Sequence, residues 1–390
     1  MTTEGGTHGA YLSEISTGDV KFDSHKSASD EIARLYANDT DGLIGFVSGS
    51  RIVRFDKYAI RINSCGSRLL FAEVDNQLKL VKADFCKVPN CSMCQWRRSL
   101  KWRAKFLTLL PEIQKNHPSH KWVFLTLTIR NCGIEQLRGT LTHLNGSFRR
   151  LYQLKSFPMD GLVKSIEVTR AWDCYHKGKY LGRHGSTWIV RWEYQNKAVL
   201  DLKPTDEVHP HLHVTGLVPA SYFTGRGYLT QAEWTQMWKQ SLRVDYDPVV
   251  HIKAVKPKKN KPLLPEPEQF ADNPIIADET GIVQAICETL KYTVKEQDLI
   301  GTYCQDEEVN SVWLKQMTQQ LYKMRRLEYK GTLKNIGKEI EEAVDDSNLI
   351  EINENEETGE VPTRELEFRW NYAIKRYVLN REFKLDKLGT

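Results

Sequence analysis

Apolar residues recur at two different spacings along the chain, and the spacings predict strands and helices in a mixed order. Alternating or continuous apolar runs rich in β-branched residues predict strands in the segments RLLFAEV, KWVFLTLTIRN, GLVKSIEVTR, HPHLHVTGLV and PVVHIKAVK. Apolar positions three and four residues apart predict helices in WRRSLKWRAKFLTLL, LTQAEWTQMWKQSLRV, roughly 280–297 and VNSVWLKQMTQQLYKMRRL. Thr230 and Glu233 have the spacing of a capping box. The order predicts an α+β domain with an antiparallel sheet.

The patterns divide the chain into four regions. Residues 1–50 are polar and predict a partly disordered extension, and 51–112 form a cysteine-containing module with strands at RIVRFDKYAIRIN. Residues 113–302 form the α+β domain, in which 171–208 is expected to be an inserted hairpin with a strand at STWIVRWEY. Residues 303–390 are expected to be helical, with an acidic segment at 339–360.

Composition and charge narrow the class of protein. Of the 390 residues, 40% are apolar and 27% charged, and no run reaches the roughly 18 apolar residues of a membrane span. The first residues have neither the basic start nor the apolar stretch of a signal peptide, so we expect a cytoplasmic protein with reduced thiols. The net charge is +5, although the acidic segment holds ten acids and no Lys or Arg. The basic remainder indicates a nucleic-acid partner, with an ordinary soluble surface as the alternative.

Four of the eight cysteines lie close together. Cys86, Cys91 and Cys94 give the pattern C-x4-C-x2-C, and Cys65 precedes them beside a glycine. Four thiolates at short spacing close a tetrahedral structural Zn²⁺ site. The basic and aromatic stretch QWRRSLKWRAK follows directly, and it is either a DNA contact or a solvated amphipathic helix.

The segment HPHLHV holds three histidines at alternate positions. On a strand, His211 and His213 point to one face, while Leu212 and Val214 face a core. This arrangement suits a metal or a phosphate, and a merely polar strand face is the alternative.

A third chemical pattern is CETLKYTVKEQD. On a helix, Glu288, Tyr292 and Lys295 fall within a sector of about 60°, opposite a buried apolar stripe. A phenol there can act as a covalent nucleophile. The alternative is an ordinary set of surface contacts one helical turn apart.

Taken together and in order, these motifs resemble the rolling-circle replication initiators of small bacterial plasmids, which belong to the HUH endonuclease superfamily. The matches are FLTLTIRN, HPHLHV and KYTVKEQD, supported by the cysteine segment and WTQMWKQSLRVDYDP, and they cover roughly 60–330. The resemblance implies that 113–302 is an HUH nicking domain and that 51–112 is a zinc-binding, DNA-contacting module.

The resemblance also implies a role for each site residue. His211 and His213 would bind Mg²⁺ or Mn²⁺, with Glu167 as the favoured third ligand and His209 as its competitor. Tyr292 would attack the scissile phosphate and form a 5′-phosphotyrosyl link. Glu288 would activate the water that ends the reaction, and Lys295 would position DNA or balance charge.

The implied partners are plasmid origin DNA, as a single-stranded nick site with flanking duplex, and a host helicase and polymerase. The protein is expected to be a monomer or dimer without a membrane partner. Two other functions remain possible: a histidine-triad nucleotide hydrolase, because HPHLHVT fits His-x-His-x-His, and a non-enzymatic zinc-dependent DNA-binding protein.

Overall fold

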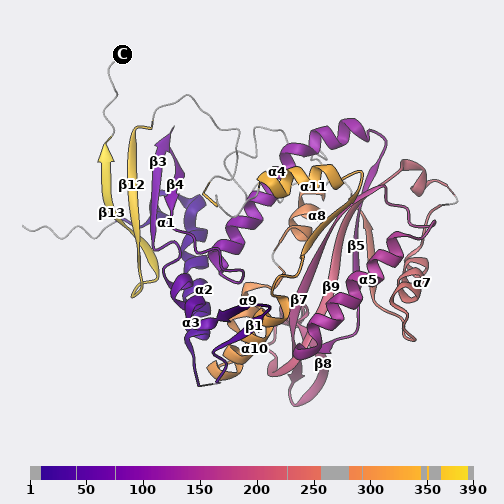
Figure 1. Ribbon diagram of the computed structural model, residues 1–390, viewed down its shortest axis with the longest axis horizontal. Helices are drawn as coiled ribbons and strands as arrows, with labels where there is room; N and C mark the ends of the chain where they lie inside the picture. The colour runs from indigo at the N-terminus through magenta and orange to yellow at the C-terminus, as the bar shows by residue number, and fades with distance from the viewer. Residues whose placement is uncertain are drawn as a thin grey trace, which may run out of the picture. The chain divides into compact units, whose positions relative to one another are not determined.

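The computed structural model describes residues 10–40, 42–74, 76–225, 227–255, 281–291, 293–343, 349–350 and 362–384. Helices and antiparallel sheets are mixed along the chain (Figure 1). The chain divides into two compact units. We call Met1–Ala37, Arg54–Lys101 and Val344–Thr390 the cysteine unit, and Asn38–Val53 with Trp102–Ala343 the sheet unit.

A seven-stranded antiparallel sheet is the centre of the sheet unit. Its main order is β10-β5-β9-β7-β11, with β6 beside β9 and β8 beside β7. The two long central strands, β7 and β9, supply most of the pairing. The strands are β5 Lys121–Thr128, β6 Cys132–Gly133, β7 Gly161–His176, β8 Lys179–Gly185, β9 Asp201–Val218, β10 Val250–Ala254 and β11 Leu327–Gly331.

Helices cover both faces of this sheet. Figure 1 shows α5 (Leu137–Tyr152) and α7 (Gln231–Leu242) on one side, and α8 (Gly281–Thr289) and α11 (Lys334–Ala343) on the other. Leu212 and Val214 of β9 are fully buried, whereas Thr215, the next residue, bonds to the α8 residue Ala285. Alternate residues of β9 therefore separate an apolar face from a polar face that lies under α8. The unit also contains β1 Gly45–Ser48, α6 Ser186–Asn196, α9 Glu296–Ile300 and α10 Glu307–Leu321.

The cysteine unit is built from three separated stretches of the chain. Its sheet has the order β13-β12-β3-β4, so the two C-terminal strands pair with β3 (Figure 1). The Leu379 amide donates to the Ala10 carbonyl over 2.9 Å, and the Trp370 indole donates to Asp30 over 2.8 Å. The elements are α1 Leu12–Ile15, α2 Val20–Ala37, α3 Phe55–Asn63, β3 Arg68–Val74, β4 Gln77–Ala83, β12 Arg364–Asn371 and β13 Arg376–Lys384, and β2 Arg51–Arg54 and α4 Ser92–Asn116 each continue across the boundary between the units.

Most of the predicted elements are present. Five of the predicted strands correspond to β3, β5, β7, β9 and β10, and three of the predicted helices correspond to α4, α7 and α10. The predicted capping box at the start of α7 is also confirmed: the Thr230 hydroxyl accepts from the Glu233 amide over 3.3 Å, and the Glu233 carboxylate accepts from the Thr230 amide over 2.7 Å.

One predicted strand is a helix, and another is a strand only over its first four residues, Arg51–Arg54 (β2). Phe55–Asn63, within RIVRFDKYAIRIN, is α3, because Phe55, Ala59 and Ile62 are buried at helical rather than alternating spacing. STWIVRWEY lies in α6, where Ser186 and Ile189 are buried, so 171–208 is a strand–helix insertion and not a simple hairpin.

The ends of the chain also differ from expectation. Within the expected partly disordered extension, α2 is an 18-residue helix that buries Phe22, Ile32 and Leu35. The C-terminal region is not wholly helical, because Leu366, Phe368 and Trp370 are buried at alternate positions of β12. Much of the acidic segment lies outside the described residues.

Within the described residues, no helix is both long enough and apolar enough to cross a membrane.

Candidate metal and nucleophile site

Strand pairing brings the two motif histidines and Glu167 together. In the register of β7 and β9, His211 is opposite Glu167, and His213 is opposite Ser165. Residues opposite one another in an antiparallel sheet share a face, so all three of the functional side chains project to the side that α8 covers. The candidate ligands therefore sit on the two central strands.

The three side chains meet at one carboxylate oxygen. Glu167 Oε2 lies 2.7 Å from His213 Nε2 and 3.3 Å from His211 Nε2. All three residues are buried, and their potential ligand atoms lie within 4.8 Å of one another. The outer ring nitrogens are also engaged: His213 Nδ1 is 3.2 Å from Thr126 Oγ1, and His211 Nδ1 is 3.3 Å from the His209 carbonyl oxygen. These contacts hold the Nε2 atoms toward Glu167.

Electrostatics keep Glu167 ionised. Burial alone would raise the pKa of its carboxyl, but hydrogen bonds from His211 and His213, with the charges of His211 and Lys291, hold that pKa well below its usual value. Burial lowers the pKa of His213. The group therefore offers a carboxylate and a neutral imidazole, the forms that bind metals.

His209 is placed differently from the other two histidines. Its Nδ1 is 2.8 Å from Asn131 Oδ1, and burial lowers its pKa to about 4. Among the described residues, the group of potential ligands on this face contains Glu167 and not His209. The geometry thus favours Glu167 over His209 as the third ligand.

The segment with the tyrosine motif is not one helix. Helix α8 ends at Thr289, Val294 forms a bridge with Val168, and Lys295 precedes α9 in an extended conformation. The expected single helical face for Glu288, Tyr292 and Lys295 is therefore wrong. Tyr292 lies outside the described residues. The predicted apolar stripe is nevertheless buried, at Ile286, Leu290 and Val294.

Glu288 and Lys295 still reach the histidine cluster by different routes. Glu288, on the last turn of α8, places Oε1 3.7 Å from His213 Nε2. Lys295 places Nζ 3.5 Å from Glu167 Oε1 and donates to the Thr187 hydroxyl at the start of α6. The segment that surrounds Tyr292 is thus attached to the site at both ends.

Lys291 was missed by the sequence analysis. Its Nζ lies 2.7 Å from Glu167 Oε2 and also donates to Glu288 Oε1. Burial would lower the pKa of Lys291, but the charges of Glu167 and Glu288 outweigh it and raise the pKa. On a continuous helix Lys291 would lie about 60° from Glu288 and 40° from Lys295, so the spacing Glu288-x-x-Lys291 was a signal in the sequence that could have found it.

The donor set fits a small divalent cation. Two imidazole nitrogens and one carboxylate oxygen on a rigid sheet leave coordination positions open for water or a phosphate oxygen, as Mg²⁺ and Mn²⁺ sites require. The contacts of His213 with Thr126, and of His211 with a backbone carbonyl, are the outer hydrogen bonds that orient metal-binding histidines.

The four predicted zinc ligands also converge. Cys65, Cys86, Cys91 and Cys94 have sulfur atoms within 4.8 Å of one another, including 3.5 Å between Cys65 and Cys94. Tetrahedral Zn–S bonds of about 2.3 Å separate sulfur atoms by roughly 3.8 Å. Backbone amides of Cys86 and Lys87 donate to Cys65 Sγ and Cys94 Sγ over 3.3 and 3.2 Å. Thiolates accept such bonds, so the cluster fits Zn²⁺.

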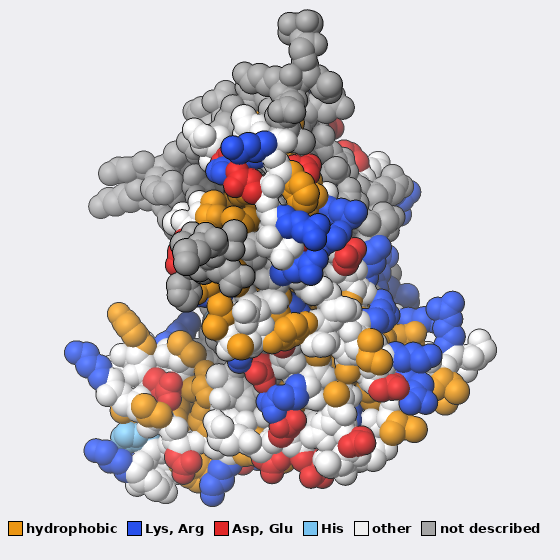
Figure 2. Space-filling view, turned by 90° about the vertical axis from the view of Figure 1, so that its left-hand side faces the viewer, with side chains coloured by type: hydrophobic (Ala, Val, Ile, Leu, Met, Phe, Trp, Pro, Cys, Tyr) orange, Lys and Arg blue, Asp and Glu red, His pale blue; other side chains and the backbone are white. Residues whose placement is uncertain are grey.

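The basic stretch after the cysteines is largely internal. Arg97 and Lys101 are each only 5% exposed, and the Arg97 guanidinium donates to the carbonyls of Leu349 and Ile350. Trp96 is buried and stacks on His25 at 4.7 Å. Arg97 and Lys101 are therefore buried in the packing of the fold and not on a solvated helix face, and a DNA contact by this stretch stays a prediction. On the face shown in Figure 2, Lys and Arg side chains are interspersed with Asp and Glu.

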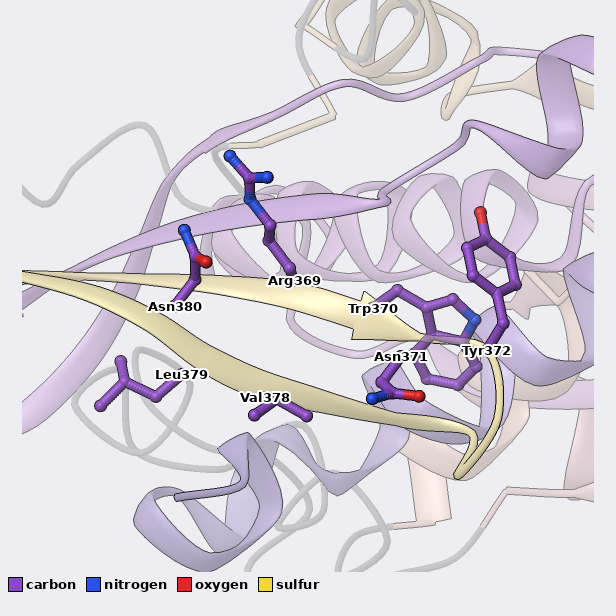
Figure 3. A pocket seen from close by; sticks show the side chains of 7 residues that line it. All are labelled: Arg369, Trp370, Asn371, Tyr372, Val378, Leu379 and Asn380. Carbon is purple, nitrogen blue, oxygen red and sulfur yellow. The ribbon is translucent and has the colours of Figure 1, made fainter. Parts of the chain in front are cut away.

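A shallow pocket of about 360 Å³ lies on the β12–β13 hairpin (Figure 3). Its lining includes Arg369, Trp370 and Tyr372 but none of the candidate metal or catalytic residues. We assign it no role.

The fold and sites define an α+β protein with a Cys₄ group in one unit and, on the central sheet of the other unit, a Glu-His-His group that Lys291 contacts. A family model described as "Replication protein" matches residues 77–378. The chain belongs to this family, the plasmid replication initiators that its motifs resemble.

Several curated relatives align over most of the chain. Protein rep of Bacillus amyloliquefaciens is 30% identical over 331 residues, which cover 83% of this chain and 86% of the relative. Protein rep of Lactiplantibacillus plantarum is 29% identical, with 83% and 88% covered. A replication protein of Staphylococcus aureus is 27% identical, with 70% and 95% covered. No solved structure gives a significant match.

Proposed function

We propose that this protein starts rolling-circle plasmid replication by nicking one DNA strand at the origin through Tyr292. The observation that carries the proposal is the convergence of Glu167, His211 and His213 within 4.8 Å, with Glu288 3.7 Å from His213 on the helix that leads toward Tyr292. Family membership supplies the context of replication.

In the first step, the Tyr292 phenol oxygen attacks the scissile phosphorus. A bond forms between that oxygen and phosphorus, the bond to the 3′ oxygen breaks, and the phenolic proton is lost as the 3′ oxygen gains one. The products are a 5′-phosphotyrosyl link and a free 3′-OH from which a polymerase extends.

A divalent cation held by Glu167, His211 and His213 would withdraw electron density from the phosphate oxygens. The protein's own share is orientation. Thr126 fixes the His213 ring, and pairing of β7 with β9 fixes Glu167 opposite His211. Lys295, 3.5 Å from Glu167, is placed to balance the negative charge of bound DNA.

The last step is hydrolysis, for which Glu288 is the candidate base. Its side chain is 45% exposed, so water reaches the carboxylate, and it stands beside the histidine cluster. Glu288 takes a proton from water as the water oxygen attacks the phosphorus, the bond from phosphorus to the tyrosine oxygen breaks, and that oxygen takes back a proton. This step releases the DNA and restores the phenol.

The cysteine unit would add the DNA contacts that select the origin, with Zn²⁺ holding its fold. We propose that a host helicase and polymerase act on the nicked origin. The reaction takes place in the cytoplasm.

Labelled single-stranded origin DNA with Mn²⁺ tests the proposal. Wild-type protein should form a covalent protein–DNA adduct that resists denaturant. Tyr292→Phe should form none while it binds origin duplex at the wild-type level, since phosphate contacts supply most affinity. Origin binding without any adduct in the wild type would favour a non-enzymatic DNA-binding protein, and a histidine-linked nucleotide adduct would favour a histidine-triad hydrolase.

Glu288→Ala separates the two chemical steps. Adduct formation should persist, while release by water should slow by about 10² to 10⁴-fold, the usual contribution of a general base. The product in a replication assay should be longer than one plasmid unit. Unit-length product at the wild-type rate would show that Glu288 is only a surface contact.

A further inference from the structure

The Glu167 carboxylate already has a cationic partner on the oxygen that a metal would use. Glu167 Oε2 faces both histidine Nε2 atoms, so a cation bound by all three residues must approach this oxygen. Lys291 Nζ lies 2.7 Å from the same oxygen. An ammonium and a divalent cation at such separations repel each other strongly, because both occupy a buried site of low polarity.

Lys291 also joins the two carboxylates of the site. It donates to Glu288 Oε1 as well as to Glu167, so one ammonium neutralises part of two negative charges. Glu167 is only 2% exposed and would otherwise carry a buried charge that costs stability. Lys295 differs, because its Nζ lies 3.5 Å from the other oxygen, Oε1.

We propose that Lys291 is an internal counter-ion that holds the metal site together without metal and leaves Glu167 Oε2 when a divalent cation binds. This inference rests on the proposed metal site. Because Lys291 directly precedes Tyr292 in the chain, its departure moves the residue next to the nucleophile.

Mn²⁺ binding to the DNA-free protein tests the proposal, measured from the electron paramagnetic resonance signal of free Mn²⁺. Lys291→Met removes the competing charge and keeps the length of the side chain, so Mn²⁺ should bind roughly tenfold or more tightly than to wild type. Lys291→Arg, which keeps the charge, should stay near wild type. Lys295→Met should gain less, since Lys295 leaves Oε2 open.

Thermal unfolding gives a second measurement that needs no activity. Without metal, Lys291→Met should unfold at a lower temperature than wild type, because Glu167 loses its counter-ion. Saturating Mn²⁺ should raise the unfolding temperature of Lys291→Met by more than that of wild type. Lys291→Gln serves in the same way if the Met variant does not fold without metal.

Three outcomes overturn different statements. Equal or weaker Mn²⁺ binding by Lys291→Met overturns the counter-ion role alone. If Glu167→Gln leaves Mn²⁺ binding unchanged, the metal site of the proposed function fails, and the inference fails with it. If wild-type protein forms no tyrosine adduct while Lys291→Met binds Mn²⁺ more tightly than wild type, the nicking function is overturned and the counter-ion role of Lys291 is supported.

Discussion

Side chains that are not themselves candidate ligands orient the ligands of the site through hydrogen bonds. Thr126 is an example, because its hydroxyl lies 3.2 Å from His213 Nδ1 and so orients the other ring nitrogen, Nε2, toward Glu167. We expect Thr126→Val to weaken Mn²⁺ binding about 10- to 100-fold, the usual effect of losing an outer hydrogen bond. Thr128→Val is the matched control, since the Thr128 hydroxyl donates to the Val249 carbonyl instead. Equal losses in both variants would contradict an orienting role for Thr126.

Asp298 is a buried acid on α9, and we expect it to make the stability of the protein depend on pH. Burial raises its pKa to about 7, although Lys295 and Arg170 act in the opposite direction. In the unfolded chain the carboxyl ionises near pH 4. Between about pH 4 and 7, the folded state therefore holds a proton that the unfolded state has lost, and this group makes stability fall as pH rises.

Asp298→Asn should remove that dependence. The free energy of unfolding of the variant minus that of wild type should be larger at pH 8 than at pH 4. The increase should be up to about 4 kcal/mol, because the folded and unfolded pKa values of Asp298 differ by about three units. Urea unfolding at the two pH values gives the comparison. The same change in stability at both would mean that Asp298 is ionised in the folded protein.

At the scale of elements, helix ends decide how the inserted segment and the site are built. Helix α6 ends at Asn196, and the residue that caps it, Lys197, has a φ of 47°, in the left-handed region that favours glycine. Lys197→Gly should raise the free energy of unfolding by roughly 0.5–1 kcal/mol, because it relieves this strain. Gln195→Gly, two residues earlier and within the helix, should lower it by about 1 kcal/mol. Thermal or urea unfolding of the pair distinguishes the two positions.

The same helix ends show where sequence patterns succeed and fail. Long strands such as β7 and β9 were predictable because their apolar runs have one interpretation. Glu167 was named from the family resemblance, and the register of the two strands puts it opposite His211. The end of α8 at Thr289 was not predictable, because the apolar stripe of Ile286, Leu290 and Val294 continues past it at helical spacing. What ends the helix is pairing with β7: the Val168 amide donates to the Thr293 carbonyl over 2.7 Å.

Lys291 was missed although its spacing from Glu288 is a local signal, and its contact with Glu167 could not be predicted because Glu167 lies on β7. A contact made by a distant strand carries no local signal, so the residues around Tyr292 could be named from sequence but their directions could not. The cysteines were easier to assign, because four ligands of one chemical type at short spacing restrict the possible arrangements. The strand predicted at STWIVRWEY was wrong because a short run rich in Trp, Ile and Val suits a helix as well as a strand.

At the scale of the whole molecule, the cysteine unit depends on segments far apart in the chain. Tyr377, on β13, donates its hydroxyl to the Gly66 carbonyl beside Cys65, and Ser29 of α2 lies 3.5 Å from Cys91 Sγ. Removal of residues 362–384 should therefore release zinc, although every cysteine remains. Cys91→Ser should do the same directly, because structural zinc supplies folding energy. Elemental analysis measures both, and full zinc in the shortened protein would contradict the dependence.

The three-part construction of the cysteine unit has a consequence during protein synthesis. A ribosome completes α2, the cysteines and the entire sheet unit before β12 and β13 emerge to fill the sheet beside β3. The sheet unit, with its tyrosine, can thus fold on the ribosome while the cysteine unit still waits for its last strands. A polypeptide released early from translation would keep the sheet with Glu167, His211 and His213 but lack the completed cysteine unit. If that unit selects the origin, only chains translated through β13 would nick DNA at the correct place.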